Sequence, residues 1–436
     1  MNLDTITHII FVSTEDDKYL VKGGIGTYLG IFSRTLKEKY KKINVIWISE
    51  SYTSEKFIEI SGNLKRIYIP QKENQKYSLA KDISYEVENE INEAFKNFGE
   101  YARIIIESPE WEGLLSELYS KIKSKQILKV TRFHTPLIVT AKLNGLVLNS
   151  EDKKQIEREK IQAISSDLLS FPTNYIKESC LAKMIKEKEF DIPFITISNC
   201  IDTKRFFPEF NTRNEAIRAF FELTSVNINP DDLNIFILGS IEKRKGTDLI
   251  VSMVEEVVKI LPNAKFYFIG HYHIDGDNEL TANKKLSVSD LKSSLSINAQ
   301  QNIFFVGYID HHKIPSVMQA GDLFIINYLG DNFPGVIAEI GLSKRPLLAL
   351  PRGGVKEILE VDDKYAALII DGFTSEEIIN SGVKQILSFY SSVKDDFLVD
   401  MFYKKLIQNY NEDTIVELLL SSYSNSLNEK FNEFNS

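Results

Sequence analysis

Two acidic residues eight positions apart, Asp331 and Glu339, flank a Pro-Gly break. Proline suits the first turn of a helix, so we expect a helix from about Pro334, capped by Asp331 or Asn332. The free N–H groups of residues 333–336 would then be available to an anion. Glu339, in the second turn, could accept hydrogen bonds from a ribose diol, or it could be an ordinary exposed helix position.

A basic loop is expected at the end of the strand 234–239. Lys243, Arg244 and Lys245 follow that strand and lead to a glycine and a helical segment, 246–261. Cationic side chains at the start of a helix can bind a diphosphate, because the helix dipole adds positive potential there. Three basic residues in a row are, taken alone, also typical of a solvated charge run.

A glycine-rich segment lies near the N-terminus. Gly23 and Gly24 precede an amphipathic segment, 27–40, so the backbone there can approach a ligand and offer N–H groups to an anion. The pattern is similar to a loosened dinucleotide fingerprint, with Glu50 in the place of the ribose-binding acid. That fingerprint follows its strand directly, however, whereas the segment TEDDKYLVK intervenes here. A glycine turn that only allows helix–sheet packing is the alternative.

Two polar segments follow expected strands in the first half of the chain. SPEWEG, residues 108–113, follows the strand 103–107, and RFHTP, residues 132–136, ends the strand 129–133. Functional loops collect at the carboxyl ends of parallel strands. His134 could exchange a hydrogen bond with a sugar hydroxyl or a phosphate, or it could cap the next helix.

Continuous apolar runs alternate with helical patterns along almost the whole chain, as parallel sheets covered on both faces require. The first series of expected strands comprises residues 9–13, 45–49, 66–69, 103–107, 129–133, 168–171 and 194–198. The second comprises residues 234–239, 265–270, 303–307, 323–327, 346–350 and 367–370. Residues 202–232 interrupt the strands, and residues beyond about 384 are helical in pattern. We therefore predict an α/β protein with two doubly wound parallel sheets and a ligand cleft between them.

Composition narrows the class of protein. The 436 residues suggest two domains, and the apolar content of 43% is typical of a soluble globular protein. The net charge of −9 argues against nucleic acid as the main partner. Cys180 and Cys200 form no disulfide framework or metal-ligand spacing, which fits a reducing cytoplasm. The first residues do not have the pattern of a signal peptide, and no apolar run is long enough for a membrane span. Histidines in two later loops lack carboxylate neighbours at metal-ligand spacing and are expected at the surface: His271, His273, His311 and His312.

The order of these motifs resembles that of the retaining glycosyltransferases of the GT-B fold, specifically glycosyltransferase family 4. The segments that carry the resemblance are GGIGTY (23–28), SFPTNYIKES (170–179), ISNCIDTKRFFP (197–208), GSIEKRKG (239–246), VGYIDHHKIPSVMQAGDLFI (306–325) and the stretch from Asp331 to GGVKE (353–357). The resemblance covers nearly the whole chain. It implies two Rossmann-like domains, an acceptor-side domain 1–205 and a donor domain 206–414, with a C-terminal helix, about 415–436, that packs back on the first.

The resemblance also implies site residues. Lys245 would grip the diphosphate, Glu339 would bind ribose hydroxyls and Asp331 would lie at the donor sugar, which His134 would also contact. The catalytic set is then His134, Asp331 and Lys245. The donor-binding set is Gly23, Gly24, Ser240, Arg244, Lys245, Asn332, Phe333, Gly335, Val336 and Glu339. The acceptor-side set is Glu107, Glu110 and Trp111. No metal and no cofactor are implied beyond a nucleotide-diphosphate sugar, with a UDP-sugar favoured.

Four positions depart from the family pattern. Ser240 replaces an arginine, and we hypothesise that Arg244 substitutes for it. Asp331 is shorter than the usual glutamate, and Arg345 and Cys200 each replace a glycine. The alternatives to a transferase are a non-catalytic GT-B partner subunit of an active glycosyltransferase, a nucleotide-sugar epimerase, and, least favoured, an oxidoreductase. The epimerase requires a pair of acid and base groups, which the sequence does not reveal.

The acceptor is expected to carry a hydroxyl group and to be a glycan, a glycolipid, a protein or a small molecule. The oligomeric state is not predicted. We expect a cytoplasmic protein and leave open a peripheral contact with the inner face of the membrane. Basic segments 123–129 and 153–160 could make that contact, although each is more typical of a solvated helix face.

Overall fold

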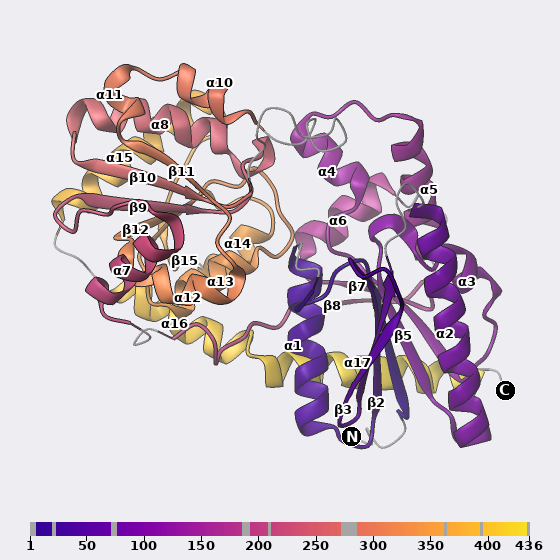
Figure 1. The fold of residues 1–436 in the computed structure, drawn as a ribbon. Coiled ribbons are helices and arrows are strands. Elements are labelled where there is room, and N and C mark those ends of the chain that lie inside the picture. The colour runs from indigo at the N-terminus through magenta and orange to yellow at the C-terminus, as the bar shows by residue number, and fades with distance from the viewer. Residues whose placement is uncertain are drawn as a thin grey trace. The chain divides into compact units, whose positions relative to one another are not determined.

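The computed structural model of the chain describes residues 6–19, 23–70, 76–184, 192–207, 211–271, 286–361, 364–392 and 396–433. The chain folds into two compact units (Figure 1). The first comprises Met1–Thr140, Val147–Ile201 and Tyr410–Ser436, and the second comprises Ala141–Leu146 and Asp202–Asn409. The sequence-based division lay after residues 205 and 414, whereas the contacts in the structure divide the chain after residues 201 and 409.

An eight-stranded sheet forms the centre of the first unit, in the order β3-β4-β2-β1-β5-β6-β7-β8. Every neighbouring pair is parallel except β3 and β4. The strands are β1 (His8–Ser13), β2 (Asn44–Ser51), β3 (Phe57–Ser61), β4 (Leu64–Pro70), β5 (Ile104–Pro109), β6 (Ile127–Arg132), β7 (Leu168–Phe171) and β8 (Phe194–Thr196). The central strands β1, β5 and β6 are buried along their whole length, which explains their continuous apolar sequences.

Helices cover both faces of this sheet (Figure 1). They are α1 (Gly24–Lys39), α2 (Lys76–Phe98), α3 (Ser116–Lys121), α4 (Leu137–Asn144), α5 (Ser150–Ile164), α6 (Asn174–Lys183) and α17 (Glu412–Glu433). Apolar residues of α1 and α17 share one core, whereas α2 and α3 belong to the core on the other face.

The C-terminal helix α17 completes the first unit. Leu419, Leu420 and Tyr423 are fully buried in the core that α17 shares with α1. The Tyr423 hydroxyl donates a 2.6 Å hydrogen bond to the buried Glu107 carboxylate at the end of β5. The helix is therefore part of the first unit's core and braces the carboxyl end of a central strand.

A six-stranded, wholly parallel sheet forms the centre of the second unit, in the order β11-β10-β9-β12-β13-β16. The strands are β9 (Leu233–Leu238), β10 (Ala264–Ile269), β11 (Ile303–Gly307), β12 (Leu323–Ile326), β13 (Leu347–Ala349) and β16 (Leu368–Ile369). A short antiparallel ribbon, β14 (Glu360–Val361) and β15 (Lys364–Tyr365), lies outside the sheet.

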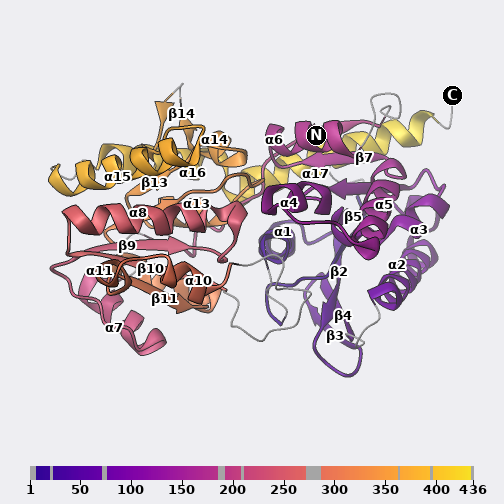
Figure 2. The ribbon, with the colours of Figure 1, turned by 90° about the horizontal axis from the view of Figure 1, so that it is seen from above.

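The second unit's helices are α7 (Arg213–Thr224), α8 (Thr247–Ile260), α10 (Val288–Ser293), α11 (Ile297–Gln300), α12 (Ile314–Val317), α13 (Gly335–Leu342), α14 (Gly354–Leu359), α15 (Ser375–Ser391) and α16 (Phe397–Asn409). Helices α8 and α15 lie side by side over one core (Figure 2). A cluster of aromatic rings, Phe220, Phe236, Tyr267 and Phe324, packs α7 against the sheet.

Every strand predicted from the sequence occurs in the structure, with ends that differ by at most two residues. β3 and the β14–β15 ribbon were not predicted. β3 is an edge strand whose Ile58 and Ile60 are exposed, so its pattern gives no sign of a buried face. The basic segment 123–129 is not a helix face, because it forms a turn leading into β6 and Lys129 is buried. Within the described residues, no helix is both long enough and apolar enough to cross a membrane.

Candidate functional site

The carboxyl ends of two neighbouring strands bring together the donor residues predicted in the second unit. β9 and β12 are parallel neighbours, so the loops that follow them emerge at the same edge of the sheet. The loop after β9 carries Lys245 in a single 3₁₀ turn, η5 (Lys243–Lys245). The loop after β12 carries Asp331 and leads into α13. The fold thus places the basic and acidic motifs in contact although they are far apart in the sequence.

Gly246, which follows the basic turn, makes this contact possible. Gly246 has a φ of 66° and is the N-cap of α8. A Cβ atom there would lie 2.1 Å from the carbonyl oxygen of Asn327, in the loop after β12. The left-handed backbone and the close approach both exclude a side chain. The Lys-Gly pair of the sequence motif therefore has a structural reason: the glycine lets the two loops touch.

An ion-pair cluster forms where the loops meet. The Lys245 ammonium donates to Asp331 Oδ2 and lies 3.6 Å from the centre of the Tyr328 ring. Arg244 donates to the same Asp331 oxygen from Nη1 at 3.2 Å and to Glu242 from Nε at 2.9 Å. Two cations and two carboxylates thus offset one another within a few ångströms. We expected Lys245 to point at a diphosphate, but in the structure its ammonium is paired with Asp331.

Burial and charge set the protonation of this cluster. Burial alone would raise the pKa of Asp331, but Lys245 and Arg244 outweigh that effect and lower it to about 2. Burial lowers the pKa of Lys245 to about 8, although Asp331 favours its charged form. Asp331 is therefore ionised at neutral pH and Lys245 is largely so. Burial alone would lower the pKa of Arg244, but the attraction of Asp331 outweighs it and raises the pKa above its usual value. Arg244 therefore supplies a second positive charge.

The prediction that Asp331 or Asn332 caps α13 is wrong. The N-cap of α13 is Pro334, and no side chain caps the helix. The Asp331 carboxylate instead pairs with Lys245 and accepts a hydrogen bond from the Asn332 backbone N–H at 2.9 Å. Gly335, the first helical residue, is exposed and has open space where a Cβ would be. The first turn of α13 can therefore be approached by a ligand.

The donor-binding residues predicted around this turn differ in their exposure. Asn332 is buried, whereas Phe333, Val336 and Ser240 are half-buried, and Ser240 lies two residues beyond the end of β9. The carbonyl oxygen of Asn332 lies where a Cβ on Gly354 would be, at 1.3 Å. The Gly354 N–H also donates to the Asp331 carbonyl at 2.8 Å. The second glycine of GGVKE thus supports the loop that carries Asp331.

Glu339 faces a histidine that the sequence did not assign. His311 Nε2 lies 2.7 Å from Glu339 Oε1, and the two side chains are 24% and 16% exposed. The prediction of a surface position holds only in part for His311, which is half-buried and packs between Arg205 and Glu339. It is correct for His271 and His312, which are exposed, whereas His273 lies outside the described residues.

His134 lies at the carboxyl end of β6 in the first unit. Its backbone N–H donates to Glu110 Oε2 at 2.7 Å, and its ring lies 5.7 Å from that of Tyr28. Burial, and then the charge of Arg132, lower the pKa of His134 to about 3. His134 is therefore a neutral hydrogen-bonding group at physiological pH and not a cation. Arg132 is itself fully buried and donates to Ser170 Oγ at 2.6 Å.

The three acceptor-side candidates lie in β5 or directly after it, and the two carboxyls among them are buried. Glu107 is 2% exposed and bonded to Tyr423, and burial raises its pKa. Glu110 is completely buried, and burial followed by the nearby Glu159 raises its pKa to about 8. Glu107 thus bonds to helix α17 and Glu110 to the His134 backbone, and their role toward an acceptor stays a prediction. Trp111 is half-buried.

Gly23 and Gly24 are exposed at the start of α1, as anion binding would require. The sequence did not reveal Glu15, whose Oε2 accepts a 3.0 Å hydrogen bond from the N–H of Gly26. A carboxylate of the chain itself thus bonds to the first turn of α1. Gly26 also approaches the carbonyl of Asp16 so closely that a Cβ would lie 2.6 Å from it, which gives this glycine a packing role.

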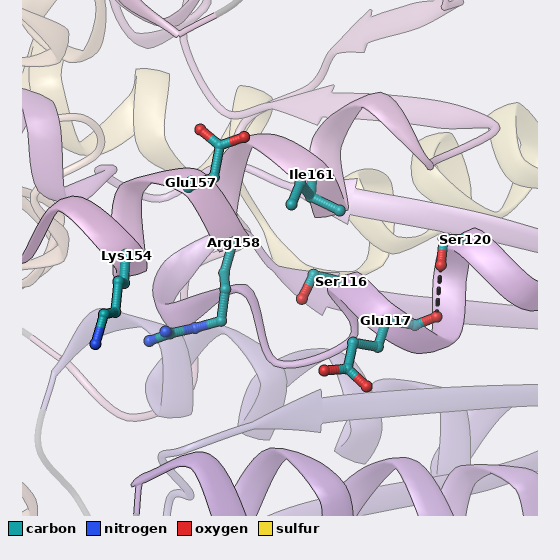
Figure 3. A pocket seen from close by; sticks show the side chains of 7 residues that line it. All are labelled: Ser116, Glu117, Ser120, Lys154, Glu157, Arg158 and Ile161. Atoms are coloured by element: carbon teal, nitrogen blue, oxygen red, sulfur yellow. Dashed lines mark hydrogen bonds between the residues drawn. The ribbon is translucent and has the colours of Figure 1, made fainter. Parts of the chain in front are cut away.

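A pocket of about 470 Å³ opens between α3 and α5 in the first unit (Figure 3). It is lined by Ser116, Glu117, Ser120, Lys154, Glu157, Arg158 and Ile161. Two cations and two carboxylates balance one another there, and no predicted site residue is among them, so we do not assign it to the site. Across the described ranges, no three His, Cys, Asp or Glu side chains lie together as a metal site would require.

Comparison with known proteins matches the region around the ion-pair cluster. Residues 232–387, which include Lys245, Asp331 and Glu339, match the family model described as Glycosyl transferases group 1. One component of the phosphatidylinositol N-acetylglucosaminyltransferase of Arabidopsis thaliana is 26% identical over 153 residues, 35% of this chain and 32% of that protein. Alpha-galactosylglucosyldiacylglycerol synthase of Streptococcus pneumoniae is 20% identical over 249 residues, 57% of this chain and 58% of that protein. The chain spans between about a third and three fifths of the length of the curated relatives it matches.

Solved structures match almost the whole chain. The catalytic domain of starch synthase IV from Arabidopsis thaliana has a TM-score of 0.70 at 13% identity and covers 97% of this chain and 100% of that one. Sucrose-phosphate synthase from Thermosynechococcus elongatus has a TM-score of 0.66 at 16% identity and covers 96% and 98%. At such identities the likeness concerns the fold, and it confirms the predicted α/β class with two Rossmann-like parallel sheets, the GT-B fold. Family 4 and the retaining mechanism stay predictions.

Proposed function

We propose that the protein is a retaining glycosyltransferase that moves a sugar from a nucleotide-diphosphate sugar to a hydroxyl acceptor. The observation that carries this proposal is the cluster of Lys245, Arg244 and Asp331 beside the uncapped first turn of α13. It lies within the region that matches the glycosyl transferases group 1 model. Cations and free helix N–H groups at the carboxyl edge of a parallel sheet form an anion site of the kind that a diphosphate requires.

The cluster suits the charge change of the reaction. The bond between the anomeric carbon and the phosphate oxygen breaks, and the electron pair leaves with the diphosphate. Lys245 retains two ammonium hydrogens beyond the one it gives Asp331, and Arg244 retains guanidinium donors beyond those it gives Asp331 and Glu242. These donors can stabilise the negative charge that develops on the leaving group. The acceptor hydroxyl forms the new bond on the face that the diphosphate leaves and gives its proton to the leaving diphosphate oxygen, so that the anomeric configuration is retained.

The remaining donor contacts come from α13 and its loop. Glu339 accepts hydrogen bonds from the ribose hydroxyls, and the N–H groups of Phe333, Gly335 and Val336 approach the sugar or the phosphates. Asp331, held by Lys245, faces the donor sugar. The roles of His134, Gly23 and Gly24, which lie in the first unit, stay predictions from the sequence. We propose that the protein's own cations serve the leaving group, without a metal or a cofactor, and that the reaction takes place in the cytoplasm.

A UDP-sugar is the favoured donor. Among structurally similar proteins, HepE from Anabaena is described in complex with UDP-glucose, although a likeness at 12% identity supports only the fold. Two relatives are named for lipid products or substrates, and a third is named mannosylfructose-phosphate synthase. A test of the acceptor must therefore include both lipid-linked and small soluble hydroxyl compounds.

The test is to incubate the protein with UDP-, GDP- and ADP-sugars and a panel of acceptors, and to measure nucleotide release and glycoside formation. We expect one donor to be consumed in an acceptor-dependent manner, with an anomeric configuration unchanged in the product. Lys245→Ala and Glu339→Ala should each reduce the rate. The proposal fails if no donor is consumed, or if both variants react as fast as the natural protein.

Ser240 motivates a second candidate, a non-catalytic subunit that stabilises an active glycosyltransferase. It stands where the family has an arginine that clamps phosphate, and Arg244, the suggested substitute, is already bonded to Glu242 and Asp331. Such a subunit would bind no donor and would co-purify with an active homologue. Donor binding by the isolated chain, lost in Lys245→Ala, would rule this candidate out.

A further inference from the structure

Three side chains from separate segments of the second unit form a continuous hydrogen-bonded chain that ends at Glu339. Arg205 Nη1 lies 3.3 Å from His311 Nδ1, and His311 Nε2 lies 2.7 Å from Glu339 Oε1. Arg205 precedes α7, His311 begins the 3₁₀ turn η6 (His311–Lys313), and Glu339 lies on α13. The ring of Phe206, which is 3% exposed, packs 6.0 Å from the imidazole. The imidazole is thus held from both ends and from one side.

This arrangement determines which imidazole nitrogen carries the proton. A guanidinium can only donate hydrogen bonds, so Nδ1 of His311 must accept from Arg205. In the neutral ring the proton then lies on Nε2, and this N–H group donates a hydrogen bond to Glu339 Oε1. A doubly protonated ring would turn an N–H toward the guanidinium, and that hydrogen bond would be lost. Arg205 therefore favours the neutral tautomer in which the Nε2–H group of His311 donates a hydrogen bond to Glu339.

The consequence for Glu339 is a carboxylate whose orientation is fixed. Oε1 accepts from His311, and among the hydrogen bonds of the described residues none involves Oε2. A carboxylate has about four acceptor positions, so the two on Oε2 and the second one on Oε1 remain, which is enough for two further donors. A vicinal diol presents two O–H donors at that spacing. Without His311, the glutamate side chain would be free to rotate, and the diol would have to order it at an entropic cost.

We propose that Arg205 and His311 are positioning residues that orient Glu339 toward the vicinal ribose hydroxyls of the nucleotide. The inference rests on the proposed function, since it takes Glu339 as the ribose-binding group. It goes beyond the sequence motifs, which include neither the histidine nor its tautomer.

The test compares the affinities for UDP and 2′-deoxy-UDP by calorimetry. In the natural protein we expect UDP to bind about tenfold or more tightly than 2′-deoxy-UDP, because a hydrogen bond to a carboxylate is lost. His311→Leu should bring this ratio close to one, and it should weaken the binding of UDP more than that of 2′-deoxy-UDP, which keeps only the 3′-hydroxyl contact. His311→Gln keeps an amide donor near the place of Nε2 and should restore most of the ratio. Arg205→Met should give an intermediate ratio.

His312→Leu is the matched control, because His312 is the next residue, is exposed, and pairs with Asp310 instead of Glu339. It should bind both nucleotides like the natural protein. If His311 had only a structural role, His311→Leu would weaken the binding of both nucleotides equally or would lower only the melting temperature. Either result would overturn the inference. If UDP binding discriminates but His311→Leu keeps the full ratio, the inference fails and the proposed function stands. If UDP, GDP and ADP all fail to bind, the proposed function falls, and the inference with it.

Discussion

The buried carboxyl of Glu110 should make the free energy of unfolding depend on pH, and the size of this effect can be calculated. Its Oε2 accepts from the His134 N–H, whereas its Oε1 is buried without a hydrogen-bond partner. Burial, and then Glu159, raise the pKa of Glu110 to about 8, against 4.5 for an unperturbed glutamate. A neutral carboxyl with its proton on Oε1 is the state that fits these contacts.

The sign of the pH dependence follows from this shift. Because the pKa is higher in the folded protein, the contribution of Glu110 to stability is complete below pH 4.5 and is lost as the pH rises toward 8. Each pH unit in that window costs about 1.4 kcal/mol, so roughly 2 to 3 kcal/mol should be lost between about pH 5 and pH 7. Glu110→Gln cannot ionise and should lack this loss. Burying the glutamine amide has a cost in stability that is the same at both pH values, so it cancels when the two values are compared.

Tryptophan fluorescence during urea unfolding is the appropriate assay. The chain has two tryptophans, Trp47 and Trp111, and both lie in the first unit with Glu110, so the signal follows that unit alone. We measure the difference in free energy of unfolding between Glu110→Gln and the natural protein. Between about pH 5 and pH 7 this difference should shift by roughly 2 to 3 kcal/mol in favour of the variant. Glu88→Gln, at an exposed position of α2, controls for the loss of one carboxyl. A difference between Glu110→Gln and the natural protein that does not change with pH would refute the reasoning.

Two further predictions concern packing. Gly354→Ala should place a methyl group on the carbonyl of Asn332 and displace the Asp331 loop. We therefore expect this variant to have a lower melting temperature and to bind UDP more weakly. Gly335→Ala places its methyl group in open space and should melt like the natural protein. Equal melting temperatures for the two alanine variants would contradict this. Leu420→Ala, in the core that α17 shares with α1, should cost about 2 to 5 kcal/mol in urea unfolding of the first unit, whereas Leu418→Ala, at an exposed position of the same helix, should cost little. A small cost for Leu420→Ala would mean that α17 does not belong to that core.

The strands could be predicted because most are buried on both faces, so that each appears as an uninterrupted apolar run. β3 could not, because an edge strand with exposed isoleucines has no such run. The glycines at positions 246 and 354 were recognisable as motifs, but their reason, the close approach of two loops, exists only in three dimensions.

Side-chain pairing was the least predictable feature of the site. Asp331 was expected to cap a helix, but the contact with Lys245 depends on two strands that are neighbours in the sheet and distant in the sequence. His311 was expected at the surface because the loop histidines lack metal-ligand spacing, and nothing local shows that Glu339 lies 2.7 Å from it. Sequence patterns thus located the loops, whereas the partners within them followed from the sheet order.

The central claim is that the loops after β9 and β12 bind the donor's nucleoside diphosphate, and the dissociation constant of UDP tests it most directly. Lys245→Ala should weaken UDP binding by about 10- to 100-fold, the value of a charge-assisted hydrogen bond in a buried site. Lys243→Ala removes the same charge from the same turn at an exposed position and should change the constant less than about twofold. Equal effects of the two variants, or no effect of either, would contradict the account.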